Sequence, residues 1–293
     1  MNFLEQGNKG VGNAGTYILT VVIALLSLVI GQFVVEGLAN SILGFSMLNI
    51  PKNVDLNLIL SLMLMPFSFV LVSLVFCVRY LHKRPILSVF TSRKAFDWKR
   101  LVFAFLTWGG IMSLFLVYAI FSDDSIEFQL NWSTFIPLLL VSIFILPIQT
   151  TAEEVLFRGY LFQAFGKLFK KGWISILITG VAFGLLHGAN PEVAKIGSIL
   201  LIFYISTGLF LGIMTQMDGG IELSMGYHAV NNIFASVILT NEWQSFQTDA
   251  LFIDHSPPVF GVESWLTLLL IQPLILFIFS KKYKWKEWKK KLF

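Results

Sequence analysis

Long apolar stretches separated by shorter polar segments make up most of the chain. A helix that crosses the hydrocarbon core of a bilayer needs about 20 mostly apolar residues. Eight stretches reach or approach that length, namely residues 17–38, 56–78, 101–121, 135–161, 173–187, 198–217, 221–239 and 264–280. This pattern predicts an all-α fold: a polytopic integral membrane helix bundle with about eight transmembrane helices.

The composition excludes several other classes of protein. Only 13% of the 293 residues are charged and 56% are hydrophobic, with a mean hydropathy of +0.77, whereas soluble proteins carry roughly 25% charged residues. So few charges cannot cover the surface of a soluble globule, and the high apolar content excludes a disordered chain. The single cysteine, Cys77, lies inside an apolar stretch, which excludes a disulfide-rich secreted scaffold.

The positions of the basic residues predict the orientation of the helices. If the N-terminus lies inside the cell, every Lys and Arg except Lys52 and Lys195 falls on the cytoplasmic side. Lys and Arg gather in cytoplasmic loops, so we expect both termini to be cytoplasmic. This bias and the compact loops fit a bacterial plasma membrane. The opposite side collects acidic residues: Asp123, Asp124, Glu127, Glu242, Asp249, Asp254 and Glu263.

The net charge of +4 reflects a basic tail over residues 281–291, in which seven Lys alternate with Tyr283, Trp285 and Trp288. A nucleic-acid patch and a membrane-surface anchor can both have this composition. Tyr and Trp favour the headgroup layer, and each nearby Lys gains about 1 kcal/mol from anionic lipid. We therefore predict membrane lipid as the partner of the tail, and no nucleic acid.

A few ionisable side chains interrupt the apolar stretches. Each costs about 2.5 to 3.5 kcal/mol at the bilayer centre and needs a partner or a function. Counted at 1.5 Å per helical residue, Glu153, His187 and His228 fall at similar depths near the middle of the membrane. Their convergence from three separate stretches predicts a buried polar site.

Local spacing assigns neighbours to these groups. Glu154 and Arg158 are four residues apart, so they share a helix face and can pair, which leaves Glu153 free to point elsewhere. By the same spacing His228 and Asn232 project together, and Phe183 gives His187 an apolar wall. Asn231 is expected to turn off this face.

Two chemical routes are open to such a site, and both lead to hydrolysis. A buried Glu153 could act as general base on water, while histidine or asparagine donates hydrogen bonds to a developing oxyanion. Alternatively, Glu153, His187 and His228 could hold Zn²⁺, whose bound water ionises near neutral pH.

Other polar residues are expected to have smaller roles. We predict that Glu36 is structural and that Glu222 lies at the membrane interface. His82 and His255 lie in predicted loops and are expected to be solvated. Glu192, on a short outer loop, needs no role.

The motifs Glu153-Glu154-x-x-x-Arg158, Phe183-x-x-x-His187 and His228-x-x-x-Asn232 resemble, in order and interval, the EExxxR, FxxxH and HxxxN/D motifs of the CPBP family. This family comprises type II CaaX prenyl endopeptidases and bacteriocin-processing or self-immunity proteins, also called the Abi family. The resemblance covers residues 135–240 and implies an intramembrane endopeptidase.

By that resemblance, Glu153 would activate the water together with His187, and His228 and Asn232 would stabilise the oxyanion. Glu154, Arg158 and Phe183 would support this geometry. The family has been described both as metalloproteases and as glutamate-dependent enzymes. The resemblance implies a membrane-associated peptide or protein as substrate, and the CaaX label applies to the family and not to this substrate.

We expect a single integral membrane domain in three parts. Residues 1–134 hold three transmembrane helices without motifs, residues 135–240 form the protease core, and residues 241–293 hold an outer loop, the last helix and the basic tail. Two alternatives remain: a non-catalytic immunity or scaffold protein of the same fold, and a proton-coupled transporter, since intramembrane Glu and His also build proton relays.

Overall fold

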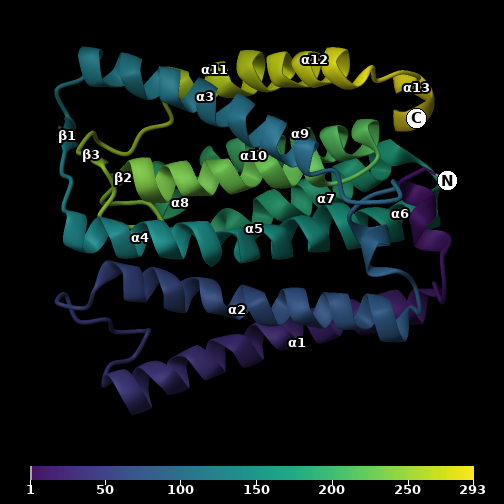
Figure 1. Ribbon diagram of the computed structural model, residues 1–293, viewed down its shortest axis with the longest axis horizontal. Coiled ribbons are helices and arrows are strands. Elements are labelled where there is room, and N and C mark those ends of the chain that lie inside the picture. The colour runs from purple at the N-terminus through teal and green to yellow at the C-terminus, as the bar shows by residue number, and fades with distance from the viewer. Residues whose placement is uncertain (1) are drawn as a thin grey trace.

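The computed structural model describes residues 2–293, which form a bundle of long helices running back and forth along one axis (Figure 1). Seven continuous helices within this described range are long and apolar enough to span a bilayer. The predicted all-α membrane bundle is confirmed. Its main helices are α1 (Ala14–Leu38), α2 (Leu56–Phe76), α3 (Trp98–Ser122), α4 (Trp132–Phe144), α5 (Leu146–Glu154), α6 (Phe162–Phe169), α7 (Gly172–Leu186), α9 (Leu200–Asp218), α10 (Glu222–Ile233) and α12 (Gln272–Tyr283).

Turns of wider π-helix continue several of these helices. They are η2 (Ala39–Leu43), η3 (Cys77–Leu81), η5 (Val155–Leu161), η7 (Phe234–Ile238) and η8 (Thr267–Ile271). The shorter helices are η1 (Leu4–Asn8), η4 (Ile86–Val89), η6 (His187–Ala189), α8 (Pro191–Ile196), α11 (Val262–Leu266) and α13 (Trp288–Leu292). One π-helical segment, η5, begins directly after Glu154, inside the long helix that runs from α4 to α6. Such segments are frequent at functional sites.

The stretch predicted over residues 221–239 differs from the other seven. It forms α10 and η7, a shorter and more polar helix that packs against α3, α5 and α9 in the middle of the bundle. Residues 222–228 are all buried. Because protein surrounds this helix, its polar side chains find partners that lipid could not supply.

A small sheet closes one end of the bundle. Strand β3 (Phe252–Asp254) pairs antiparallel with β1 (Ile126–Phe128) and parallel with β2 (Leu239–Asn241), which gives the order β1-β3-β2. The apolar pattern did not predict these strands, because each is three residues long. Through these strand pairs, the segment after α10 is hydrogen-bonded to the connection between α3 and α4.

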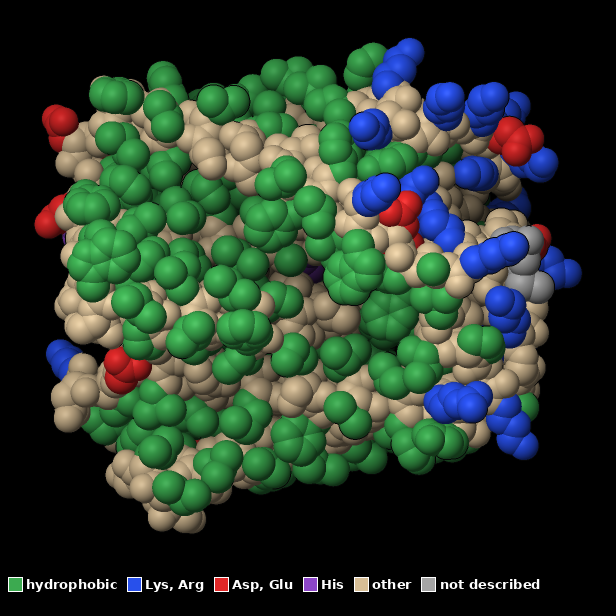
Figure 2. Space-filling view, in the orientation of Figure 1, with side chains coloured by type: hydrophobic (Ala, Val, Ile, Leu, Met, Phe, Trp, Pro, Cys, Tyr) green, Lys and Arg blue, Asp and Glu red, His purple; other side chains and the backbone are tan. Residues whose placement is uncertain are grey.

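Charge is segregated along the bundle. Figure 2 shows Lys and Arg gathered at one end beside a broad apolar belt, whereas most of the few charged side chains visible at the opposite end are Asp and Glu. We call these the basic end and the acidic end. Both chain termini lie at the basic end (Figure 1). Large apolar side chains such as Phe33 and Phe121 are exposed on the belt, as expected for a surface in contact with lipid.

Two polar side chains are buried beside partners that the sequence did not identify. Glu222, predicted at the membrane interface, is buried by protein and accepts a hydrogen bond from Arg93 Nη1 at 3.1 Å. His82 is fully buried and not solvated. Its Nδ1 lies 2.7 Å from the carbonyl oxygen of Val11, and its Nε2 lies 2.7 Å from the hydroxyl of Tyr160.

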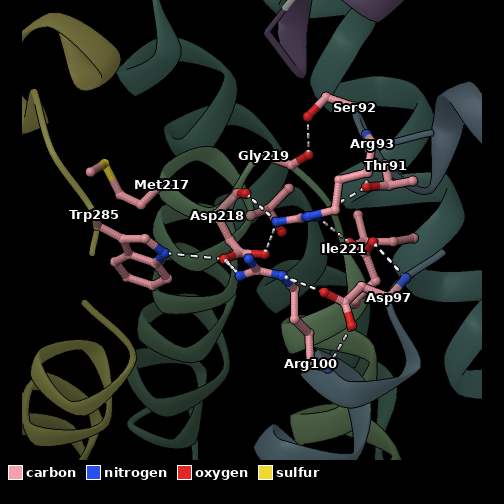
Figure 3. Close-up of polar contacts among 12 residues, drawn as sticks. Thr91, Ser92, Arg93, Asp97, Arg100, Met217, Asp218, Gly219, Ile221 and Trp285 are labelled. Carbon is pink, nitrogen blue, oxygen red and sulfur yellow. Dashed lines mark hydrogen bonds and ion pairs between the residues drawn. The ribbon is translucent and has the colours of Figure 1, made fainter. Parts of the chain in front are cut away.

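The basic tail folds back onto the bundle around Asp218, the last residue of α9 (Figure 3). The Asp218 carboxylate accepts hydrogen bonds from Arg93 at 2.7 Å, from Arg100, and from the indole N–H of Trp285 at 3.1 Å. Trp285 is 8% exposed, and Leu292 packs on the bundle core. Part of the tail is therefore packed against the bundle as a structural element.

Candidate active site

Three helical segments bring the predicted site residues together. Helix α5 carries Glu153 and Glu154, the α7–η6 junction carries His187, and α10 carries His228 and Asn232. Helix α5 starts anew after a break at Ile145, because Pro147 cannot donate the backbone hydrogen bond that would continue α4.

Glu154 is the centre of a buried charged cluster. One of its oxygens, Oε1, accepts hydrogen bonds from Arg158 Nη1 at 2.9 Å and from His228 Nδ1 at 3.0 Å. The side chains of Glu154 and Arg158 are fully buried, and the Arg158 guanidinium lies 4.0 Å from the centre of the Phe183 ring. The pair predicted from the four-residue spacing is present, and it also orients His228.

The geometry around His228 defines the protonation of its ring. A carboxylate can only accept hydrogen bonds, so Nδ1 carries the proton that is donated to Glu154. The other nitrogen, Nε2, faces Glu153 Oε2 across 3.6 Å. That separation is too long for a direct hydrogen bond.

The two oxygens of Glu153 have different surroundings. Oε1 accepts a hydrogen bond from the side-chain amide of Gln149 at 2.7 Å. Oε2 is buried and has no hydrogen-bond partner among residues 2–293. A carboxylate held at one oxygen and left free at the other has the arrangement of a general base.

A chain of amide side chains leads to this carboxylate. The indole N–H of Trp108 donates to Asn231, Asn231 donates to Asn232, Asn232 donates to Gln149, and Gln149 donates to Glu153, at distances between 2.7 and 3.3 Å. An indole can only donate and a carboxylate can only accept, so the two ends define the orientation of every amide between them.

The amide chain corrects one prediction and adds two residues. Asn231 does not turn away from the site, because it bonds directly to Asn232. The sequence interpretation missed Gln149 and Trp108. Gln149 lies four residues before Glu153, the same spacing that identified Glu154 and Arg158, and so could have been found. No comparable local signal marks Trp108, which approaches from α3.

His187 lies apart from the carboxylates. Its Nδ1 is 2.8 Å from the carbonyl oxygen of Phe183, which can only accept, so Nδ1 carries a proton and a neutral ring has its lone pair on Nε2. The Phe183 ring contacts His187 at a centroid distance of 4.5 Å and His228 at 5.8 Å. In the described chain, no hydrogen bond or ion pair joins His187 to Glu153 or His228.

The sequence of this region matches a known family. Residues 132–234 match the model described as type II CAAX prenyl endopeptidase Rce1-like. This segment is similar to the Rce1-like family. The match runs from α4 through α10 and contains all three motifs, so the predicted CPBP relationship is confirmed, and the family is one of proteases.

A bacterial relative extends the comparison. The uncharacterized protein YyaK of Bacillus subtilis (strain 168) is 39% identical over 167 residues, which is 56% of this chain and 56% of that protein. The chain thus matches about half the length of this curated relative. No solved structure matches.

A zinc site built from Glu153, His187 and His228 does not fit this arrangement of the Rce1-like segment. Zinc takes imidazole and carboxylate ligands at about 2.0–2.2 Å. Residues 2–293 contain no group of three or more His, Cys, Asp or Glu side chains placed to share a metal ion.

Proposed function

We propose that the chain is an intramembrane endopeptidase that hydrolyses a peptide bond in a membrane-associated peptide or protein. The observation that carries this proposal is the asymmetric environment of Glu153. Gln149 holds Oε1, while the buried Oε2 faces His228 Nε2 across 3.6 Å with no direct hydrogen bond. The similarity of residues 132–234 to a family of endopeptidases supports the same reaction.

In the proposed reaction, Glu153 Oε2 takes a proton from a water molecule, and the resulting hydroxide attacks the carbonyl carbon of the peptide bond. His187 Nε2 accepts a hydrogen bond from the same water. The C–N bond then breaks, and Glu153 returns its proton to the departing amine. Burial of the site strengthens each of these electrostatic interactions.

His228 and Asn232 stabilise the oxyanion that forms on the carbonyl oxygen. With a proton on Nε2, His228 donates from that nitrogen to the oxyanion, while its Nδ1 donates to the Glu154 carboxylate and keeps the ring in place. The Asn232 amide nitrogen uses one hydrogen on Gln149 and has a second one to donate. Preorganised donors of this kind are each worth about 10²–10³ in kcat.

The test uses purified protein in detergent and a library of membrane-peptide substrates. We expect cleavage by the wild type and a loss of kcat of about 10²-fold or more in Glu153→Gln and His228→Ala. Glu36→Gln is the matched control. Glu36 lies at the far end of α1, where it accepts hydrogen bonds from Asn40 and Ser46. Wild-type rates in the two site variants would show that the proposed site is wrong.

The metal alternative is tested on the same preparation. We expect kcat to be unchanged after dialysis against a zinc chelator, since the side chains form no metal-binding group in the described residues. Loss of activity on chelation, recovered by adding Zn²⁺, would replace the glutamate mechanism by a zinc mechanism.

A further inference from the structure

A buried carboxylate outside the three motifs connects to His187. Glu192, in the short helix α8, is 8% exposed although the sequence suggested no role for it. Its Oε1 accepts hydrogen bonds from the Tyr204 hydroxyl at 2.6 Å and from the Asn190 amide at 3.0 Å. Its Oε2 accepts a hydrogen bond from the Ser245 hydroxyl at 2.9 Å.

Tyr204 connects the hydrogen bonds of Glu192 to His187 in the candidate site. Its ring stacks on the His187 imidazole, with a centroid distance of 4.5 Å and an interplanar angle of 27°. The Phe183 ring contacts the same imidazole, and the Phe183 backbone carbonyl accepts a hydrogen bond from its Nδ1. Tyr204 belongs to α9, so the stacked ring holds His187 from a second helix.

The three donors come from separate parts of the chain. Asn190 precedes α8, Tyr204 lies near the start of α9, and Ser245 lies in the segment after β2. One buried carboxylate therefore joins three segments at the same end of the bundle. Burying a charged carboxylate is costly unless it is fully hydrogen-bonded. An apolar side chain would fill the same space without three donors, so the hydrogen bonds of Glu192 indicate a role beyond packing.

We propose that Glu192 and Tyr204 are positioning residues for His187, which hold the imidazole so that Nε2 points to the reacting water. This inference rests on the proposed function of His187. Tyr204 limits the tilt of the ring by stacking, and Glu192 determines where the Tyr204 ring lies by accepting its hydroxyl hydrogen. Ser245 links the segment after β2 to the same carboxylate.

Three variants distinguish the effect of the Tyr204–Glu192 hydrogen bond from that of the Tyr204–His187 stacking. Tyr204→Phe keeps the stacked ring and removes the hydroxyl, Tyr204→Leu removes the ring, and Glu192→Gln keeps the shape and removes the charge. We expect kcat to fall about 10-fold in Tyr204→Phe and Glu192→Gln and about 100-fold in Tyr204→Leu, with KM changed less than about twofold, because a small misplacement of a catalytic group mainly affects the chemical step.

The control is Glu127→Gln, which replaces an exposed glutamate of β1 at the same end of the bundle. We expect wild-type kcat and KM for it. Nitrogen-15 NMR of the histidine side chains measures the tautomer of each imidazole, which distinguishes a change at His187 from a general loss of folded protein. The chain has four His, so substitution assigns each signal. We expect one tautomer for His187 in the wild type and exchange between tautomers in Tyr204→Leu.

His187→Ala distinguishes the failure of this inference from the failure of the proposed function. If His187→Ala abolishes cleavage while the Glu192 and Tyr204 variants keep wild-type kcat and His187 signals, the positioning role is wrong and the proposed function stands. If His187→Ala keeps the wild-type rate, the proposed role of His187 is wrong. A fall in thermal stability with unchanged kcat per folded molecule would also overturn the positioning role.

Discussion

At the scale of single residues, neighbouring carboxylates have opposite environments. Glu154 is fully buried and neutralised by Arg158, whereas Glu153 is 14% exposed and keeps a free oxygen. They differ because successive positions on a helix point about 100° apart. One side chain thus faces the Arg158 guanidinium, and the other faces His228 Nε2 and the amide of Gln149.

Gln149 gives a direct test of this arrangement. We expect Gln149→Leu to lower kcat about 10-fold or more, because Glu153 loses a hydrogen bond to a charged group, worth about 1.5–3 kcal/mol. Asn57→Leu is the control, since Asn57 is a buried amide in α2 that donates to the Thr134 carbonyl away from the site. An Asn57 variant that loses as much kcat per folded molecule would contradict a specific role for Gln149.

His82 predicts how stability depends on pH. Burial lowers the pKa of its imidazole below the ordinary value, although the hydrogen bond to the Val11 carbonyl opposes this shift. The unfolded chain therefore binds a proton near pH 6.5 that the folded protein takes up only at lower pH. Below about pH 6.5 we expect the free energy of unfolding to fall as the pH falls.

The measurement is thermal unfolding in detergent between pH 8 and pH 5. We expect a smaller loss of melting temperature toward acid pH in His82→Gln than in the wild type. His255→Gln is the control, since that side chain is 41% exposed. Equal slopes for His82→Gln and the wild type would contradict the prediction.

At the scale of secondary structure, close helix packing supports the site. Helices α7 and α9 approach through glycines: Gly180 and Gly184, four residues apart in α7, and Gly208 in α9. A Cβ added to Gly184 would lie 2.5 Å from the backbone nitrogen of Ile205, so the two backbones are in contact. These helices carry His187 and Tyr204, so their separation affects the stacked rings.

We expect Gly184→Ala to destabilise the protein by about 1–3 kcal/mol, the usual cost of overpacking, and to lower kcat as α7 and α9 move apart. Gly110→Ala in α3 is the matched control, because an added Cβ there meets no atom within 4 Å among the described residues. Thermal unfolding and kcat are measured for both variants. An unchanged Gly184→Ala protein would show that the close approach has no effect on the site.

At the scale of the whole molecule, charge segregation predicts the orientation in the membrane. The basic end holds both termini and most Lys and Arg, and the acidic end holds the three-stranded sheet (Figures 1 and 2). By the positive-inside rule, we expect the basic end to face the cytoplasm. A bacterial plasma membrane would expose the acidic end to the outside.

A cysteine-accessibility experiment tests this orientation. Cys77, the single native cysteine, is buried, so engineered cysteines report independently. We expect a membrane-impermeant thiol reagent added to intact cells to label Asp124→Cys, which is exposed at the acidic end, and not Lys94→Cys, which is exposed at the basic end. The reverse labelling would invert the topology.

The sequence by itself determined the bundle, most helix ends to within a few residues and the contacts between residues four positions apart. Apolar length and the placement of Lys and Arg are properties of local sequence, and so is the pair of Glu154 with Arg158. The same local pattern also identified α10 as a span, although that helix is shorter and more polar than the others.

Only the tertiary structure decided which distant side chains meet these groups. Trp108 joins the amide chain from α3, and Tyr204 and Ser245 converge on Glu192 from two further segments. Contacts with segments distant in sequence also bury three polar side chains, those of His82, Glu222 and Glu192. In a helix that is apolar on all sides, the sequence pattern does not specify which face meets which neighbour, because helix rotation is set by packing between helices.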